Sequence, residues 1–522
     1  MKRRDFLQHT ASSFLLPVLV EGRGIRALTS ESPFMQALLR VADQTDRVLV
    51  IVQLQGGNDG LNTVIPLDQM GVYAAPNFRG NIAIPEAKAL KLASRPETGL
   101  HPAMTGFQQL FSEGKLSIVQ GVSYPSPSFS HFRASDIWMT AVDATKTAGS
   151  GWAGRYLDTQ YPGFPIGYPS ATFPDPPAIQ IGYVASSSLL GPTDSMAILL
   201  QDPDTFARLV GDKPNDPPSN TLGSYAGGQV SFIRQQQASA VSYAAQIKVA
   251  AGKAQNLATY PAANNLAAQL KIIARLIAGG LKTKVYYLTI GGFDTHAGQV
   301  DGTDTTIGLH ATLLKNVSDA ITAFQSDLTR LKIEDRVVGM TFSEFGRRAI
   351  SNGSRGTDHG TSAPMFIFGT AVKTQMVGKN PNLSDLENSN LKMQTDFRQV
   401  YSALLQDWFG ASQAAESSAL FRDFPATPVF QQLVTGVEPV SAANARLYPN
   451  PAVADVTLDS DWLTELTALR VADLAGRSIP VSFSRPDPRS IRLNVRGWPN
   501  GTYVLRAETS RGVLTQRLVV LH

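Results

Sequence analysis

Polar side chains that can bind metals or take part in catalysis follow four apolar, β-branched runs of this sequence. They are Asp59 in QGGNDG, Ser130 and His131 in SFSHFRASD, Asp294 and His296 in GGFDTH, and Glu344 in SEFGRR. Carboxylates and imidazoles are ligands of divalent cations, and a hydroxyl beside a histidine is typical of an activated nucleophile. Ligands of open α/β sheets lie beyond the carboxyl ends of strands. The four motifs therefore predict one shared site.

Each motif also has an ordinary structural explanation. An aspartate after two glycines, such as Asp59, commonly shapes a turn or caps a helix. Ser130 and His131 could equally begin the helix that follows them. Asp294 and His296 point more strongly to an ion, because alternate residues of an extended segment lie on the same side and can share a ligand. The convergence of four motifs on one sheet edge carries more weight than any single one.

A further acid and histidine, Asp358 and His359, are adjacent in the glycine- and serine-rich stretch GSRGTDHGTSAP. No predicted strand ends directly before this pair, and Glu344 already occupies the place directly after a buried strand. We therefore expect His359 to be a metal ligand, with Asp358 orienting its ring or shaping the loop. In that arrangement His359 lies within a few ångströms of Asp294 and His296.

The elements that must position these residues have the pattern of an α/β domain spanning residues 46–425. Continuous apolar runs predict buried strands at 47–54, 115–121, 284–290, 336–342 and 365–369, and apolar residues at helical spacing predict helices at 264–280, 311–331 and 395–410. We expect a sheet flanked by helices. Residues 201–260 contain no strand pattern and are interpreted as an excursion or lid over that sheet.

The C-terminal part of the chain changes class. Residues 426–445 have the composition of a linker, and residues 446–522 contain short alternating strands separated by turn signals, which predicts a small antiparallel β-sandwich. With YPNPA near its start and PNGTYVLRA near its end, this segment resembles the type A sorting domain of the type IX secretion system. That resemblance implies recognition by the secretion machinery. A carbohydrate-binding or adhesive sandwich is the alternative, but Trp462 and Trp498 are isolated and form no aromatic row.

The first 28 residues have the character of an export signal. Lys2, Arg3 and Arg4 form a basic run, and a short apolar segment at 12–20 follows. Arg3-Arg4-Asp5-Phe6-Leu7 resembles a twin-arginine signal, while an ordinary secretory signal is the alternative. We expect export through the periplasm to the cell surface or the extracellular space. No other stretch approaches the roughly 18 apolar residues of a transmembrane helix, so we expect no such segment in the mature protein.

Composition excludes some partners and some ligands. The sequence has 46 basic and 42 acidic residues, for a formal net charge of +4, and no dense basic run with interleaved aromatics. Nucleic acid is therefore not an expected partner. The sequence contains no cysteine, so thiolate ligands are excluded and any metal must be held by histidine, carboxylate, hydroxyl or water.

Taken in order, several motifs resemble one bacterial family, known as domain of unknown function 1501, within the alkaline phosphatase and sulfatase superfamily. The motifs are VQLQGGNDGLNTVIPL, GLHPAM, SFSHFRASDIW, GGFDTH and TFSEFGRR with the later TDHG, and the resemblance spans about residues 46–425. In that superfamily an aspartate after the first strand, a serine, threonine or modified cysteine, and later aspartates and histidines hold one or two divalent cations. The metal lowers the pKa of the nucleophile and neutralises charge on a phosphate or sulfate.

Carried onto this chain, the resemblance makes Asp59 the first metal ligand and Asp294 the later aspartate, with His296 the histidine that follows it. The nucleophile falls in the stretch from Ser128 to His131, where Ser130 is favoured and His131 is the second catalytic candidate. His101 in GLHPAM is typical of the family, but no role is assigned to it.

The chain departs from the superfamily where an adjacent aspartate and histidine are expected after a buried strand. Glu344 stands there instead, with Phe345 in the place of the histidine. One metal site is then expected from Asp294, His296 and His359. A second site, made of Asp59, Ser130 and Glu344, would have lost its nitrogen ligand. Such oxygen-only ligation favours magnesium, calcium or manganese over zinc.

These features predict an exported, metal-dependent hydrolase of phosphate or sulfate esters. The alternative is a non-catalytic cell-surface protein that keeps the fold and binds a glycan or another protein, and the altered second site favours this alternative. A glycosidase would need paired carboxylates along a sugar cleft, which nothing in the sequence selects. Arg347 and Arg348 are expected either to contact an anion or to be surface charges on a helix.

Overall fold

The computed structural model describes residues 46–182, 184–203, 241–431, 445–473, 478–509 and 512–522, together with the short paired strands β1 (Leu19–Val20) and β2 (Arg23–Gly24). The chain divides into two compact units, Met1–Gln431 and Gln432–His522. The rest of the expected export signal, most of the expected linker and residues 204–240 of the expected excursion lie outside the described residues. Among the described helices, none is long and apolar enough to span a bilayer.

The first unit is built on a nine-stranded sheet with the order β13-β7-β12-β11-β3-β10-β8-β9, in which β14 also pairs with β7. The strands are β3 (Val48–Leu54), β7 (Leu116–Ser123), β8 (Ala178–Ile181), β9 (Ala197–Leu200), β10 (Val285–Ile290), β11 (Val337–Phe342), β12 (Ala363–Phe368), β13 (Met376–Val377) and β14 (Thr395–Asp396). The five predicted strands are confirmed to within two residues at each end.

The direction of each strand decides which loops meet at one edge of the sheet. Strand β3 runs parallel to its neighbours β10 and β11. Strand β12 runs antiparallel to both of its neighbours, β11 and β7, so β7 again runs in the direction of β3. The carboxyl ends of β3, β7, β10 and β11 therefore lie at the same edge, and the amino end of β12 lies there too.

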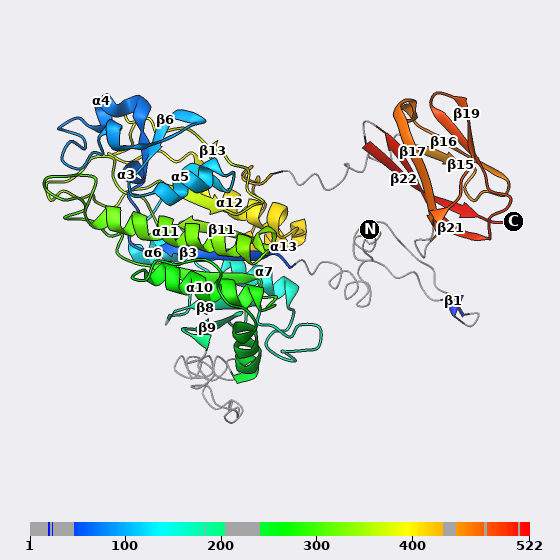
Figure 1. Ribbon diagram of the computed structural model, residues 1–522, viewed down its shortest axis with the longest axis horizontal. Coiled ribbons are helices and arrows are strands. Elements are labelled where there is room, and N and C mark those ends of the chain that lie inside the picture. Colours follow the sequence, from blue (N-terminus) through cyan, green and yellow to red (C-terminus); the bar gives the residue numbers. More distant parts are fainter. Residues whose placement is uncertain are drawn as a thin grey trace. The chain divides into compact units, whose positions relative to one another are not determined.

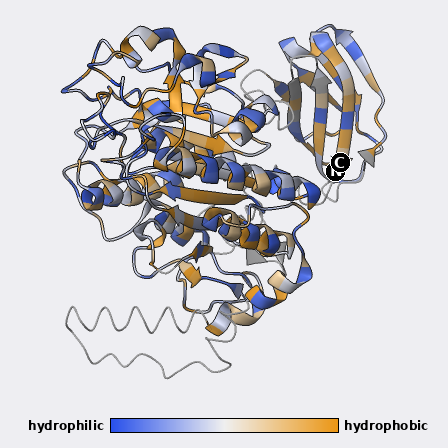
Figure 2. Cartoon of the chain, turned by 60° about the vertical axis from the view of Figure 1, so that its left-hand side comes forward, coloured by the Kyte–Doolittle hydropathy of each residue, from blue (hydrophilic) through white to orange (hydrophobic). Residues whose placement is uncertain are grey.

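Helices cover both faces of this sheet (Figure 1). They are α5 (Thr105–Ser112), α6 (His131–Thr140), α7 (Trp152–Gln160), α10 (Asn265–Ala278), α11 (Leu309–Arg330), α12 (Phe397–Ala403) and α13 (Gln413–Leu420). Every residue of β3, β7, β11 and β12 is buried, which explains why these strands are mostly apolar and do not alternate between apolar and polar residues. Figure 2 shows strands in the hydrophobic colour inside the first unit, among helices that carry both hydrophilic and hydrophobic residues.

The predicted helices at 264–280 and 311–331 correspond to α10 and α11. The side chain of Asn264 accepts a hydrogen bond from the backbone N–H of Ala267 and so caps α10. The third predicted helix begins at Phe397 and continues as a π-helical turn over Leu404–Trp408. Its cap is Asp396, which forms a capping box with Gln399.

The second unit consists of two four-stranded antiparallel sheets, which confirms the predicted sandwich. One sheet has the order β15-β16-β20-β19 and the other β18-β17-β21-β22. The strands are β15 (Arg446–Tyr448), β16 (Asp455–Asp459), β17 (Leu466–Asp473), β18 (Ser478–Ile479), β19 (Phe483–Asp487), β20 (Ser490–Asn494), β21 (Gly501–Thr509) and β22 (Gly512–Val520). Its own buried cluster includes Val456, Leu493 and Leu505, so this unit has a core separate from that of the first.

Candidate metal centre

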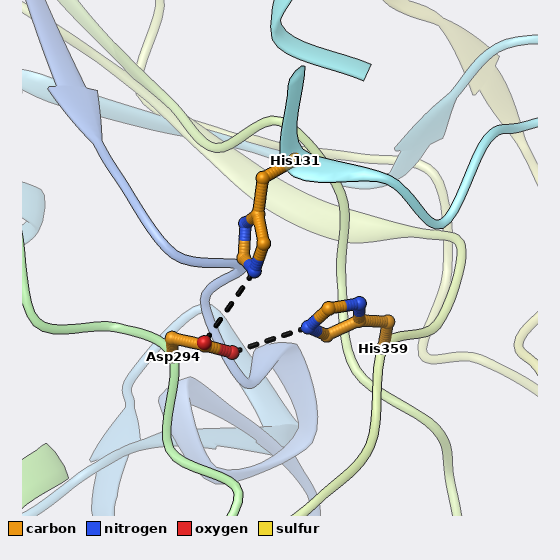
Figure 3. A group of neighbouring side chains, drawn as sticks. All are labelled: His131, Asp294 and His359. Atoms are coloured by element: carbon orange, nitrogen blue, oxygen red, sulfur yellow. Dashed lines mark hydrogen bonds and ion pairs between the residues drawn. The ribbon is translucent and has the colours of Figure 1, made fainter. Parts of the chain in front are cut away.

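Three side chains from distant parts of the sequence meet at the carboxyl edge of the central sheet (Figure 3). His131 is the first residue of α6, Asp294 follows β10 by four residues, and His359 lies four residues before β12. Nε2 of His131 lies 3.4 Å from Oδ2 of Asp294, and Nε2 of His359 lies 3.1 Å from Oδ1. One ligand atom from each residue lies within 4.8 Å of the others, as in a metal site.

His296 adds a third imidazole to this cluster. Its Nε2 lies 3.1 Å from Oδ1 of Asp294 and 2.9 Å from Nε2 of His359. The placement of His359 beside Asp294 and His296 agrees with the sequence-based expectation. The position of His131 differs from it, because the sequence suggested a catalytic partner for Ser130 and the structure aims this ring at the same carboxylate as the other two.

The second nitrogen of each imidazole contacts an oxygen acceptor. The Nδ1 distances are 2.8 Å from His131 to Oε1 of Glu344, 2.8 Å from His359 to the carbonyl oxygen of Phe129, and 3.4 Å from His296 to Oδ1 of Asp358. Such an acceptor keeps the proton on Nδ1 and leaves Nε2 as a lone pair, which is how histidine ligands are held in metal sites. With the proton of both rings on Nδ1, the lone pairs of His296 Nε2 and His359 Nε2, 2.9 Å apart, would repel one another, and a cation bound by both lone pairs would offset that repulsion.

Glu344 acts on a histidine rather than joining the cluster of ligand atoms. Its side chain is fully buried, and Oε1 accepts a hydrogen bond of 2.9 Å from the backbone N–H of Gly56 as well as contacting His131. Phe345, the next residue, packs its ring against the rings of His131 and His359, with centroid distances of 4.9 and 4.5 Å. The substitution noted in the sequence therefore gives the site an apolar wall that limits ring movement.

Asp59 has different partners from those expected of a metal ligand. It is buried beside the equally buried Arg79, whose Nη2 and Nη1 lie 2.8 and 3.0 Å from Oδ1 and Oδ2. Gln299 also donates to Oδ2, at 2.6 Å. Burial raises the pKa of Asp59, but the charge of Arg79 outweighs it and holds the pKa below its usual range. Because protein donors occupy both oxygens, these surroundings do not support Asp59 as a ligand. No sequence motif indicated Arg79 or Gln299.

Arg347 is neither the anion contact nor the surface charge that the sequence left open. Its side chain is buried and donates to Oδ1 of Asp294 at 2.6 Å, and to the carbonyl oxygens of Gly56, Gly57 (2.8 Å), Phe293 (3.1 Å) and Thr357 (2.8 Å). Burial raises the pKa of Asp294, but the hydrogen bond from Arg347 and the positive charge of its guanidinium outweigh burial and lower that pKa to about 2. Asp294 is therefore a fixed, permanently charged acceptor at neutral pH.

Ser130 is exposed and directly precedes His131 in the chain. It is the N-cap residue of α6, but its hydroxyl does not cap the helix, and its backbone N–H donates to Oγ of Ser128 at 3.3 Å. Within the described part of the chain, the Ser130 hydroxyl has no hydrogen-bonded base. The structure thus places the predicted nucleophile next to a candidate ligand in sequence without the activating contact that a serine nucleophile needs.

Family models agree with this two-unit organisation. A model described as "Protein of unknown function (DUF1501)" matches residues 46–419, and one described as "Secretion system C-terminal sorting domain" matches residues 446–521. The chain belongs to the DUF1501 family. This DUF1501 protein also carries a C-terminal sorting domain, as the motifs of residues 446–522 predicted.

Solved structures of alkaline phosphatase superfamily proteins have weak structural similarity to the DUF1501 protein. A sulfatase from Pseudoalteromonas sp. is 10% identical with a TM-score of 0.33, covering 80% of this chain and 79% of that one. A phosphonate monoester hydrolase from Silicibacter pomeroyi is 10% identical with a TM-score of 0.33, covering 87% and 92%. An alkaline phosphatase superfamily protein from Vibrio parahaemolyticus is 9% identical with a TM-score of 0.30, covering 86% and 82%. No curated protein matches the sequence at a significant level.

Proposed function

We propose that this DUF1501 protein is an exported, metal-dependent hydrolase of phosphate or sulfate esters. The observation that carries the proposal is the convergence of three imidazole Nε2 atoms on the carboxylate of Asp294, with an oxygen acceptor at each Nδ1. Buried ion pairs and structural histidines do not need three lone pairs aimed at one anion. A divalent cation bound by Asp294, His131, His296 and His359 explains all of these orientations together.

The donor set fits a transition-metal ion better than magnesium or calcium. Three nitrogens and one carboxylate are the ligands that zinc and its neighbours in the first transition series prefer, whereas magnesium and calcium take oxygen ligands. The oxygen-only site expected from Asp59, Ser130 and Glu344 is not part of this proposal, because Asp59 is paired with Arg79. When bound, such a metal supplies a Lewis acid that polarises the ester and lowers the pKa of a coordinated oxygen.

The surrounding residues hold the ligands in place. Arg347 fixes Asp294 from the buried side, Glu344 fixes the ring of His131, and Phe345 limits the movement of the rings. Ser130 is the proposed nucleophile because it is exposed and directly precedes His131, the first residue of α6. Its activation would have to come from the bound metal, since no protein base contacts the hydroxyl within the described residues.

Export supports an extracellular substrate. The sorting domain at residues 446–521 is the part of the chain that secretion machinery recognises, and we assign that machinery to the type IX system with delivery to the cell surface or medium. Entry into the periplasm would use the twin-arginine-like signal at residues 1–28. The phosphate or sulfate ester is then one that the cell meets outside, such as an esterified glycan.

The test combines metal analysis with ester hydrolysis. Purified protein should contain a transition metal by plasma mass spectrometry, and His359→Gln should lose most of it. His522→Gln is the matched control, because His522 is an exposed histidine of the second unit that contacts the carbonyl oxygen of Trp498. Wild type should hydrolyse an aryl phosphate or an aryl sulfate, and Ser130→Ala should reduce the rate at least a hundredfold.

A non-catalytic binding protein is the second candidate function, favoured by the Asp59–Arg79 pair and by the lack, among the residues that the structure describes, of a base that contacts Ser130. Bound metal without turnover of any ester would reject the hydrolase and support this candidate. Turnover that survives Ser130→Ala would keep the hydrolase and reject Ser130 as its nucleophile. Failure to bind any divalent ion would reject the metal centre itself.

A further inference from the structure

A separate cavity of about 250 Å³ lies where α6 and α13 end, whereas His131 stands at the start of α6. One part of its lining is apolar and comes from Val142, Leu420 and Phe421. The other part is charged and comes from Asp143, Lys146, Arg398 and Arg422. Drug-sized ligands occupy pockets of roughly 300–1,000 Å³, so this one suits a smaller molecule with an apolar body and a charged group.

Two residues of the cavity wall have a backbone conformation that is unfavourable for them. Ala141 ends α6 with φ 58° and Phe421 ends α13 with φ 64°, both in the left-handed region that glycine usually occupies. Arg155 holds the two helix ends together, because it donates to the carbonyl oxygens of Thr140 (2.6 Å) and Ala419 (3.1 Å). Strained positions of this kind gather at ligand clamps and other functional sites.

The ring of Phe421 is available to a ligand. The guanidinium of Arg155 lies 3.9 Å from the ring centroid and covers one face, while 54% of the residue remains exposed. A large hydrophobic side chain in a strained conformation at the rim of a cavity is not needed for the core. It does provide a flat apolar surface for the body of a bound molecule.

The charges around the cavity are not balanced. Asp143 accepts hydrogen bonds from Arg398 (2.6 Å) and Arg422 (3.2 Å), and Nζ of Lys146 lies 3.5 Å from its carboxylate. Arg398 is buried and also pairs with Asp396 at 2.7 Å. Three cations therefore face two carboxylates, which leaves one positive charge. The side chains of Lys146 and Arg422 are 71% and 56% exposed, so both can turn toward a bound anion without unfolding.

We infer that this cavity binds a small organic acid. Its anionic group, carboxylate or phosphate, contacts Lys146 and Arg422, and its apolar body packs on Val142, Leu420 and Phe421. Arg398 stays with its two carboxylates and fixes the charged side of the cavity. The site does not depend on the proposed hydrolase, because it shares no residue with the metal centre.

Isothermal titration calorimetry of the full-length protein tests this inference with four probes: benzoate, phenyl phosphate, benzylammonium and inorganic phosphate. Benzoate or phenyl phosphate should bind with saturation, and the Lys146→Gln/Arg422→Gln variant should weaken that binding at least tenfold. Lys315→Gln is the matched control, since Lys315 is an exposed lysine paired with Asp319 on α11, and it should leave binding unchanged. Benzylammonium should not bind.

Two further results separate the parts of the inference. Phe421→Ala should lower the affinity for benzoate and phenyl phosphate at least fivefold. It should change the melting temperature by no more than a few degrees, because the side chain is half exposed. Inorganic phosphate that binds as tightly as phenyl phosphate would overturn the role of the apolar wall. Equal binding of benzylammonium and benzoate, wild-type affinity in the double variant, or no saturable binding of either aromatic acid would overturn the site.

Discussion

Replacing Asp59 by asparagine separates the two roles that this residue could have. If Asp59 is a metal ligand, the Asp59→Asn variant should lose metal and keep its stability. If Asp59 is the partner of Arg79, the variant should lose stability and keep its metal. The structure favours the second outcome, because Arg79 and Gln299 donate to both carboxylate oxygens and neither Asp59 nor Arg79 is exposed beyond 1%.

The size of the effect follows from burial. Removing one partner of a buried ion pair leaves an uncompensated charge and typically costs roughly 3–5 kcal/mol. Asparagine keeps one acceptor oxygen for the guanidinium but turns an N–H₂ group toward another donor. We therefore expect the free energy of unfolding to fall by about 3 kcal/mol. The lowered pKa keeps Asp59 ionised above the ordinary carboxyl range, so the contribution is fully present at pH 7. It is lost only as the pH falls through the lower pKa of the folded state.

The assay is urea unfolding at pH 7 followed by far-UV circular dichroism, with metal content measured on the same samples. Asp59→Asn should lower the unfolding midpoint of the first unit and leave the metal content near that of wild type. Asp59→Leu combined with Arg79→Met should cost less than the sum of the two single changes, because an apolar pair leaves no buried charge behind. Loss of metal with an unchanged midpoint in Asp59→Asn would refute this reasoning and restore Asp59 as a ligand.

Three other outcomes test the fold and its buried groups. Burial lowers the pKa of His310 to about 4, so stability should fall as the pH drops from 6.5 towards 4, and His310→Gln should flatten that slope in urea midpoints measured at pH 7 and pH 5. Gly57→Ala should lower the free energy of unfolding by about 2 kcal/mol or more, because φ is +86° and the new Cβ would lie 2.4 Å from the ring of Phe345, whereas Gly71→Ala, with open space around it, should change little. A chain ending at Gln431 should keep the melting transition of the first unit, since that unit has its own core, and loss of the transition would contradict the division into two units.

The candidate site was only partly readable from the sequence. Apolar runs followed by glycines and acids indicated the edge where Asp294 and His296 lie, since a strand that is buried on both faces is visible as a continuous β-branched run. Nothing in the pattern indicated Arg79, which reaches Asp59 from a loop of irregular structure. A long-range pair of this kind leaves no periodic trace, so the sequence assigned Asp59 to a metal when a guanidinium already neutralises it.

The sequence by itself determined five of the nine strands of the central sheet, the long helices, the change of class near residue 430 and the acids and histidines whose types can bind a metal. Only the tertiary structure decided how those residues combine. No predicted strand ends directly before His359, and a strand was expected to position residues only at its carboxyl end. Strand β12 runs antiparallel to its neighbours, so its amino end lies at the active edge and brings His359 to Asp294. Strand direction depends on pairing between segments far apart in the chain, and local composition does not record it.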